Sequence, residues 1–189
     1  MNDDMDEKDA TVLVVDDQSD LLSLYVAWLA ESYDVRSATS GEEALELIDD
    51  TVDVALIDRR MPGMPGDELL EAIRDRGVGC RVAMITAVEP DTGIIDIPFD
   101  DYLIKPIDGD EIRSTVDILV QRRDYDEKSQ EFFALAAKRT AIENADRNHT
   151  NDPEYEELLA RMEELQESID ATLSELGPDD HAETSDRFS

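Results

Sequence analysis

Cysteine, histidine and long apolar runs are scarce in this chain of 189 residues. Cys80 is the only cysteine, which excludes an internal disulfide bond. No apolar stretch approaches the roughly 18 residues that a membrane-spanning helix needs. Residues 2–9 are polar and acidic, unlike a secretory signal peptide. We therefore expect a cytoplasmic chain that makes no contact with a membrane.

Basic residues are also scarce: lysine and arginine number 17 against 49 acidic residues, which gives a net charge of −32. The excess is spread along the chain, with −19 on residues 1–123 and −13 on residues 124–189. Such repulsion opposes a compact state in dilute buffer. At about 1 M salt the Debye length falls to about 3 Å, which screens it. The composition is typical of proteins adapted to molar salt, and strong apolar periodicity disfavours the alternative of intrinsic disorder.

Four short runs rich in valine, isoleucine and leucine show little polar alternation, which is typical of strands buried on both faces of a parallel sheet. They cover residues 11–17, 52–58, 81–86 and 101–104. Helical periodicity separates them, and Ser40 with Glu43 three residues later forms a capping-box pattern. The alternation of strands and helices predicts a doubly wound α/β domain over residues 10–122.

Polar side chains stand at the carboxyl ends of these predicted strands. They are Asp16, Asp17, Asp58, Thr86 and Lys105. Because the carboxyl ends of parallel strands gather at one edge of a sheet, these residues should converge in one pocket. Three carboxylates, a hydroxyl and an ammonium form a site for a hard cation and a phosphoryl group. Without a cation, one of the crowded carboxyl groups should have a raised pKa.

The ordered motifs along about ninety residues resemble the receiver domain of two-component response regulators. The matching segments are Val-Val-Asp16-Asp17, Ile-Asp58-Arg-Arg-Met-Pro62-Gly, Thr86-Ala87 and Asp101-Tyr102-Leu-Ile-Lys105-Pro106. The resemblance implies a flavodoxin-like, five-stranded parallel sheet. It also implies that a separate sensor histidine kinase donates the phosphoryl group, since His149 and His181 fall in a predicted turn and a predicted tail.

The same resemblance implies roles for the site residues. Asp17 and Asp58 would ligate Mg²⁺ directly and Asp16 through a water molecule, while the backbone carbonyl of Arg60 would supply a further ligand. Asp58 would be the nucleophile that accepts the phosphoryl group.

Lys105 would hold one phosphoryl oxygen and Thr86 would donate a hydrogen bond to another. Tyr102 would be the switch aromatic that moves inward with Thr86; the alternative is a partly buried strand tyrosine whose hydroxyl reaches water. A cis bond between Lys105 and Pro106 is also typical of this family.

Most other acidic residues are interpreted as solvated surface charges, and Asp100 and Asp101 are among these. A phosphatase of the haloacid-dehalogenase type would need an Asp-x-Asp motif after its first strand, whereas the run here is Asp16-Asp17-Gln18. We therefore expect a phosphoacceptor rather than an enzyme.

One region departs from the receiver pattern. Pro90, Gly93 and Pro98 lie between Thr86 and Asp101, where the family has a full helix. They leave room for one or two helical turns around residues 94–97. The sequence therefore does not determine which surface of this domain transmits the signal.

The remainder of the chain is helical in pattern. Arg122 to Tyr125 form either a linker or part of a continuous helix, and Asp152 with Pro153 can start a second helix that Gly177 ends. That helix carries an apolar heptad seam. Its members are Tyr155, Leu158, Met162, Leu165, Ile169, Thr172 and Leu176.

We predict a helical hairpin over residues 123–177, with disordered segments at 1–9 and 178–189. Its layout, the run Tyr125-Asp-Glu-Lys and the pair Phe132-Phe133 resemble the HalX domain of haloarchaeal receivers.

The output of this hairpin is the least determined part of the chain. Six basic residues after residue 123 form no patch, and high salt removes the counterion-release gain of DNA binding. These points favour a homodimer or a helical protein partner, although direct DNA binding stays open. The sequence thus predicts a phosphorelay response regulator whose helical module acts in transcriptional regulation. The alternative is a stand-alone receiver adaptor that acts by protein–protein interaction or dimerisation without binding DNA.

Overall fold

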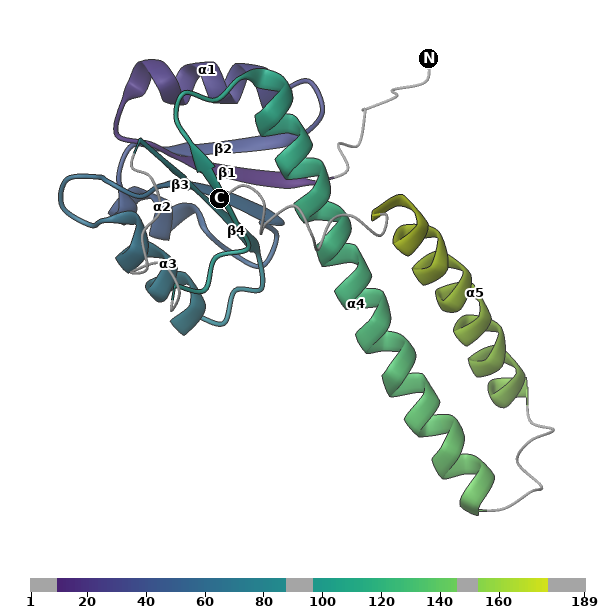
Figure 1. Ribbon diagram of the computed structural model, residues 1–189. Coiled ribbons are helices and arrows are strands. Elements are labelled where there is room, and N and C mark those ends of the chain that lie inside the picture. The colour runs from purple at the N-terminus through teal and green to yellow at the C-terminus, as the bar shows by residue number, and fades with distance from the viewer. Residues whose placement is uncertain (1–9, 88–96, 146–152, 177–189) are drawn as a thin grey trace, which may run out of the picture. The chain divides into compact units, whose positions relative to one another are not determined.

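The computed structural model describes residues 10–87, 97–145 and 153–176, and the chain divides into two compact units, residues 1–120 and 121–189. Within its described residues, the first unit contains five strands, three complete helices and the start of a fourth. These elements are β1 (Thr11–Val15), α1 (Ser19–Leu29), β2 (Asp34–Ala38), α2 (Gly41–Leu47), β3 (Val54–Asp58), α3 (Gly66–Asp75), β4 (Arg81–Thr86), β5 (Asp101–Ile104) and α4 (Gly109–Ala145). The strands form one parallel sheet in the order β2-β1-β3-β4-β5 (Figure 1). The predicted five-stranded, doubly wound fold is therefore confirmed.

Helices cover both faces of this sheet, and successive strand residues point to opposite faces. On one face, Leu13, Ala55 and Met84 belong to the apolar cluster that α2 and α3 complete. On the other face, Val14 and Leu56 belong to the cluster completed by α1 and the first turns of α4. Because both faces are covered, the central strands β1, β3 and β4 are apolar at every position between their end residues, which explains the absence of alternation in their sequences.

The predicted capping box at the start of α2 forms with a small shift. The Ser40 hydroxyl accepts a hydrogen bond from the backbone N–H of Glu43 at 3.2 Å. The Glu43 carboxylate accepts from the backbone N–H of Thr39 at 2.7 Å, one residue before the predicted donor. Both ends of the motif thus satisfy N–H groups at the helix entrance.

The described residues of the second unit form the rest of α4 and all of α5 (Pro153–Leu176). Helix α4 continues without interruption through Arg122 to Tyr125, so the continuous-helix interpretation is the correct one. Helix α5 begins at Pro153, as predicted, and lies alongside the second half of α4 (Figure 1). Arg161 Nε of α5 pairs with Glu131 Oε1 of α4 at 2.8 Å.

The heptad seam of α5 is buried within a single chain. The buried seam residues are Tyr155, Met162, Leu165, Ile169 and Thr172. Acidic residues between them are exposed, among them Glu156 and Glu163. The seam therefore pairs α5 within its own unit, as the apolar spacing predicts.

Several predictions fall outside the described residues. They are the short helical turns near residue 94, the Asp152 cap, the Gly177 helix end and the segments 1–9 and 178–189. Among the residues that are described, no helix combines the length and apolarity needed to cross a membrane.

We expect Cys80 to be chemically silent in the folded protein. It lies one residue before β4 and is buried, and this burial raises the pKa of its thiol, while the Arg74 guanidinium acts in the opposite direction. In molar salt, iodoacetamide should modify Cys80 at least about tenfold more slowly than after denaturation, because access and thiolate fraction are both low. The rate should also rise only at higher pH than for an exposed thiol. Mass spectrometry of timed samples measures both effects, with Cys80→Ser as the blank; rapid labelling in molar salt would contradict the buried placement.

Candidate functional site

The five predicted site residues all stand at the carboxyl edge of the sheet. Asp16 and Asp17 follow β1, Asp58 ends β3, Thr86 ends β4 and Lys105 follows β5. The backbone N–H of Lys105 donates to the Thr86 carbonyl at 2.7 Å, which continues the pairing of the two strands to the site. The order of the strands in the sheet thus brings together residues that are far apart in the sequence.

Lys105 connects two of the carboxylates. Its Nζ lies 2.8 Å from Asp16 Oδ2 and 3.4 Å from Asp58 Oδ2. Asp16 and Asp58 are buried, while Asp17 is exposed at the mouth of the site. The Asp16 carboxylate also accepts from the backbone N–H of Gln18 at 2.8 Å, which fixes its orientation. The ammonium is therefore held between the two carboxylates.

The electrostatics of the site depend mainly on burial. Burial raises the pKa of Asp58, although the Lys105 charge and the Arg60 N–H at 3.2 Å from Oδ1 oppose the rise. The charge of Asp16 adds to the rise to a smaller extent. The sequence correctly predicts one raised carboxyl pKa, but desolvation rather than repulsion is its main cause. For Lys105, burial favours the neutral form, yet the Asp16 hydrogen bond and the nearby carboxylates outweigh it and raise the pKa.

The three aspartates can hold a metal ion. Asp16, Asp17 and Asp58 each offer a carboxylate oxygen, and these atoms lie within 4.8 Å of one another. With Lys105 the group carries a formal charge of −2. Clustered carboxylate oxygens are the donors that Mg²⁺ prefers, and its remaining positions are usually filled by water. The donor set therefore fits Mg²⁺, while the predicted carbonyl ligand at Arg60 stays a prediction.

A glycine that the sequence reasoning missed allows the close approach of α3 to the site. A Cβ atom at Gly66 would lie 2.4 Å from the backbone oxygen of Asp58 and 2.8 Å from Cα of Arg59. Any side chain there would displace the backbone of the proposed acceptor. The segment from Asp58 to Gly66 is thus tightly folded against the end of β3, and the backbone N–H of Gly66 donates to the Arg59 carbonyl at 2.9 Å.

Tyr102 is buried in β5, and its hydroxyl accepts from Arg59 Nη1 at 3.4 Å. Arg59 also pairs with Asp67 of α3, with Nε 3.1 Å from Oδ2. The ring of Tyr102 lies 5.4 Å from that of Phe99. A residue directly after the proposed acceptor therefore connects the proposed switch aromatic to α3, a link that the sequence reasoning missed.

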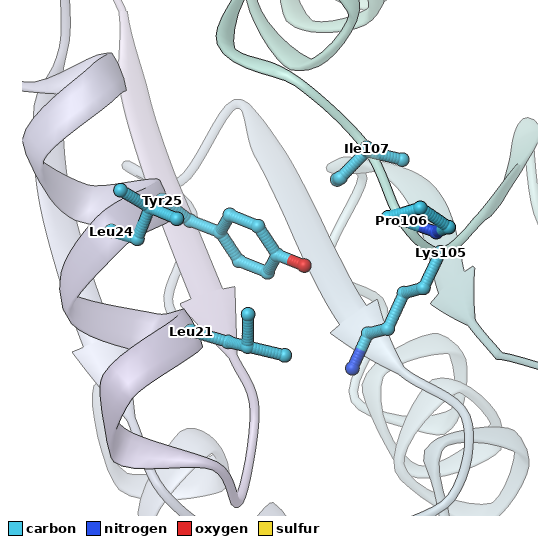
Figure 2. Close-up of a pocket in the computed structure, with 6 residues that line it drawn as sticks. All are labelled: Leu21, Leu24, Tyr25, Lys105, Pro106 and Ile107. Atoms are coloured by element: carbon cyan, nitrogen blue, oxygen red, sulfur yellow. The ribbon is translucent and has the colours of Figure 1, made fainter.

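Lys105 and Pro106 are joined by the predicted cis bond. Figure 2 shows both residues and Ile107 opposite Leu21, Leu24 and Tyr25 of α1. The segment after β5 thus supplies the site ammonium on one side and faces α1 on the other.

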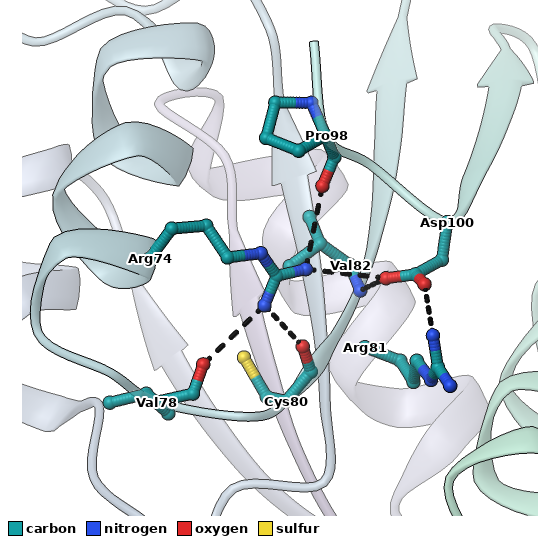
Figure 3. A network of polar contacts seen from close by, with 7 residues as sticks. All are labelled: Arg74, Val78, Cys80, Arg81, Val82, Pro98 and Asp100. Atoms are coloured by element: carbon teal, nitrogen blue, oxygen red, sulfur yellow. Dashed lines mark hydrogen bonds and ion pairs between the residues drawn. The ribbon is translucent and has the colours of Figure 1, made fainter. Parts of the chain in front are cut away.

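The interpretation of Asp100 as a surface charge is wrong. Its carboxylate accepts from Arg81 Nη1 at 2.6 Å, from the backbone N–H of Val82 at 2.8 Å and from Arg74 Nη2 at 3.3 Å (Figure 3). Arg74 also donates to the Cys80 carbonyl at 2.7 Å. Asp100 therefore ties the start of β5 to β4 and α3, at the opposite ends of the strands that carry Thr86 and Lys105.

A doubly wound parallel sheet with three aspartates, a threonine and a lysine at its carboxyl edge defines the receiver class of signalling domain. Residues 12–117 match the response regulator receiver domain family, and residues 121–188 match the HalX domain family. The chain belongs to the response regulator receiver family and carries a HalX domain after its receiver domain.

Known proteins support this placement. A Haloferax volcanii protein, provisionally named a transcriptional regulator, is 46% identical over 164 residues, covering 86% of this chain but only 28% of the relative. The receiver domain of Francisella response regulator 1452 is 33% identical with a TM-score of 0.56, over 60% of this chain and 98% of that chain. The Thermotoga maritima response regulator TrrA, solved in complex with Mg²⁺ and BeF, is 28% identical with a TM-score of 0.50, over 58% of this chain and 98% of that chain.

Proposed function

We propose that this response regulator accepts a phosphoryl group on Asp58 from a sensor histidine kinase. A carboxylate oxygen of Asp58 attacks the phosphorus of a phosphohistidine, the phosphorus–nitrogen bond breaks, and the imidazole leaves with the bonding electron pair and takes up a proton. The observation that carries the proposal is the placement of Lys105 Nζ 2.8 Å from Asp16 and 3.4 Å from Asp58. Asp58 is thus a buried carboxylate whose close neighbours are charged groups, the Lys105 ammonium and the Asp16 carboxylate, rather than apolar side chains.

Asp17 and Asp58 would hold Mg²⁺ directly, with Asp16 acting through water and Arg60 through its carbonyl. When bound, the ion supplies positive charge that neutralises the phosphoryl oxygens. Lys105 would hold one phosphoryl oxygen, and the hydroxyl of Thr86 would donate to another. The TrrA complex with Mg²⁺ and BeF supports the choice of metal. In this scheme the chain receives and releases a phosphoryl group but is not itself an enzyme.

Tyr102 and Thr86 would carry the signal away from the site. The contacts of the Tyr102 hydroxyl with Arg59, and of Arg59 with Asp67, favour the switch role over a strand tyrosine that only reaches water. Movement of Tyr102 would then change the ion pair at the start of α3. The structural unit that responds would extend beyond β5.

The output would come from the helical hairpin, residues 123–177, which follows a receiver of residues 10–122. The name of the Haloferax volcanii relative supports a role in transcriptional regulation. The exposed acidic faces of α5 support action through protein partners or dimerisation, with the adaptor role as the alternative. The charge composition supports a cytoplasm of molar salt as the working environment.

Mg²⁺ should bind before any phosphorylation. Three clustered carboxylates face one ammonium, so the ion relieves repulsion at the site even without a phosphoryl group. Titration in molar KCl, followed by calorimetry or by the fluorescence of Trp28, should give an affinity at least about tenfold lower for Asp17→Ala. Asp20→Ala, an exposed acid on the first turn of α1, is the matched control and should bind as wild type does. Equal affinity in wild type and Asp17→Ala would contradict the assignment of this site.

A further inference from the structure

A cavity of about 310 Å³ lies between α1 and the segment that follows β5. Its lining residues are Leu21, Leu24, Tyr25, Lys105, Pro106 and Ile107 (Figure 2). The volume is at the lower end of the range for small-molecule sites, which are typically apolar clefts with a few well-placed polar groups. The mouth is open to solvent at Leu24, which is exposed, so a molecule can enter.

The polar group of this cavity is the hydroxyl of Tyr25. The residue is only 2% exposed, and its ring packs against that of Trp28 at 5.9 Å. The hydroxyl points across the cavity toward Lys105 (Figure 2), and it makes no hydrogen bond to any other residue that the structure describes. The hydroxyl oxygen is not one of the fully buried polar atoms without a partner, so it is open to the cavity and can pair with a molecule that enters it. Burial also raises the pKa of Tyr25, so the phenol keeps its proton and can donate.

The charges around the cavity favour a neutral occupant. The Lys105 ammonium is already engaged by Asp16 at 2.8 Å and lies 3.4 Å from Asp58. These two carboxylates and one ammonium leave a net negative charge behind the lysine, which repels an anion. A cation would be repelled by the Lys105 ammonium, which lines the cavity and is closer than the carboxylates. The remaining walls are apolar, so an uncharged body gains most from burial there.

We propose that this cavity binds a small neutral molecule with an apolar ring or branched aliphatic body and one hydrogen-bond acceptor. The Tyr25 hydroxyl donates to that acceptor, while Leu21, Leu24, Pro106 and Ile107 cover the body. The bound molecule lies against the side chain of Lys105 and so reaches the edge of the aspartate site. Recognition depends on one phenol and on apolar walls that do not include the proposed metal ligands.

Three probe molecules of similar size separate the contributions of the apolar ring, the hydrogen-bond acceptor and negative charge to binding. Benzyl alcohol carries a ring and an acceptor, toluene carries the ring alone, and benzoate carries the ring with a negative charge. We expect benzyl alcohol to bind roughly three- to tenfold more tightly than toluene, as one net hydrogen bond allows, and benzoate to bind most weakly. Binding is measured on the full chain in molar KCl without Mg²⁺ or phosphodonor, by amide NMR shifts in α1 and residues 104–108. The fluorescence of Trp28, which packs against Tyr25, is a second readout.

Tyr25→Phe removes the hydroxyl and keeps the ring, so it should reduce the affinity for benzyl alcohol to that for toluene and leave toluene unchanged. Tyr125→Phe, which removes a phenol from α4 in the other unit, is the matched control and should change neither affinity. Leu24→Phe should weaken both probes by filling the mouth. A cavity that holds water only would show no shift with any probe, and this result would overturn the proposal. Equal affinities for benzyl alcohol and toluene in wild type, unchanged in Tyr25→Phe, would overturn it as well.

Discussion

Incubation with a small phosphodonor and Mg²⁺ in molar salt should place a phosphoryl group on Asp58 alone, and Asp58→Asn should lose this labelling by at least about a hundredfold. The reason is that an amide lacks the anionic oxygen that attacks phosphorus. Asp58 is buried beside Lys105, whose ammonium can follow the phosphoryl group. Asp16 is instead engaged by Lys105 and by the N–H of Gln18. Trapping of the acyl phosphate and mapping by mass spectrometry give the position of the label.

The matched control for this experiment is Asp50→Asn, an exposed acid that precedes β3 by several residues. It should be labelled on Asp58 at the wild-type rate. A label found on Asp17, or labelling that persists in Asp58→Asn, would contradict the assignment of Asp58 as the acceptor. Because asparagine nearly preserves the size of aspartate, loss of labelling in a variant with an unchanged melting temperature reports on chemistry rather than on folding.

The parts of the fold that the sequence predicts well are those where burial leaves a strong pattern. β1, β3 and β4 are covered on both faces, so their apolar runs and the polar residues that end them are visible without a structure. β2 (Asp34–Ala38) leaves no apolar run in the sequence, because three of the five residues of this edge strand are polar and only Ala38 is buried. Arg36 in β2 donates a hydrogen bond to the Leu47 carbonyl at 2.8 Å. Such a side-chain contact leaves no periodic pattern in the sequence from which the strand could be predicted.

Side-chain partners far apart in the sequence were harder to predict than strand ends. Asp100 is one acid among many in a chain of this composition, and only the approach of Arg74 and Arg81 reveals its role. The need for glycine at position 66 becomes visible only in the structure, where a Cβ atom would lie 2.4 Å from the backbone oxygen of Asp58. Tyr25 appears in the sequence as one more apolar position of α1, and its hydroxyl becomes informative only beside Lys105. The residue types at the strand ends predict the chemistry of the aspartate site. Which other residues lie close enough to influence that site depends on the tertiary structure.

The stability of the second unit depends on the seam of α5. Its described residues offer one apolar contact surface between two helices, and both Met162 and Leu165 are less than one tenth exposed. Exposed apolar residues on the same helix, such as Leu173, contribute little to that surface. Removal of each buried side chain would cost about 2–5 kcal/mol, which is a large share of the stability of a small helical unit.

Replacement of Met162 and Leu165 together by aspartate should therefore unfold the hairpin or abolish its assembly. Each change removes buried apolar surface and places an unpaired charge on the seam, where it has no partner. In molar salt, circular dichroism should show loss of helix equivalent to much of α5, which has 24 residues. Sedimentation of the same samples should show whether an oligomer is lost, while the receiver keeps its own thermal transition.

Leu173→Asp is the matched control, because it makes the same chemical change at a position of α5 that is 48% exposed. It should keep both the helix content and the oligomeric state. The acids that flank the seam would face phosphates at close range if α5 entered a DNA groove, so its exposed surface is expected to meet protein. A double variant with unchanged fold and assembly that has lost sequence-specific DNA binding would reverse this conclusion, since the seam residues would then contact bases rather than α4.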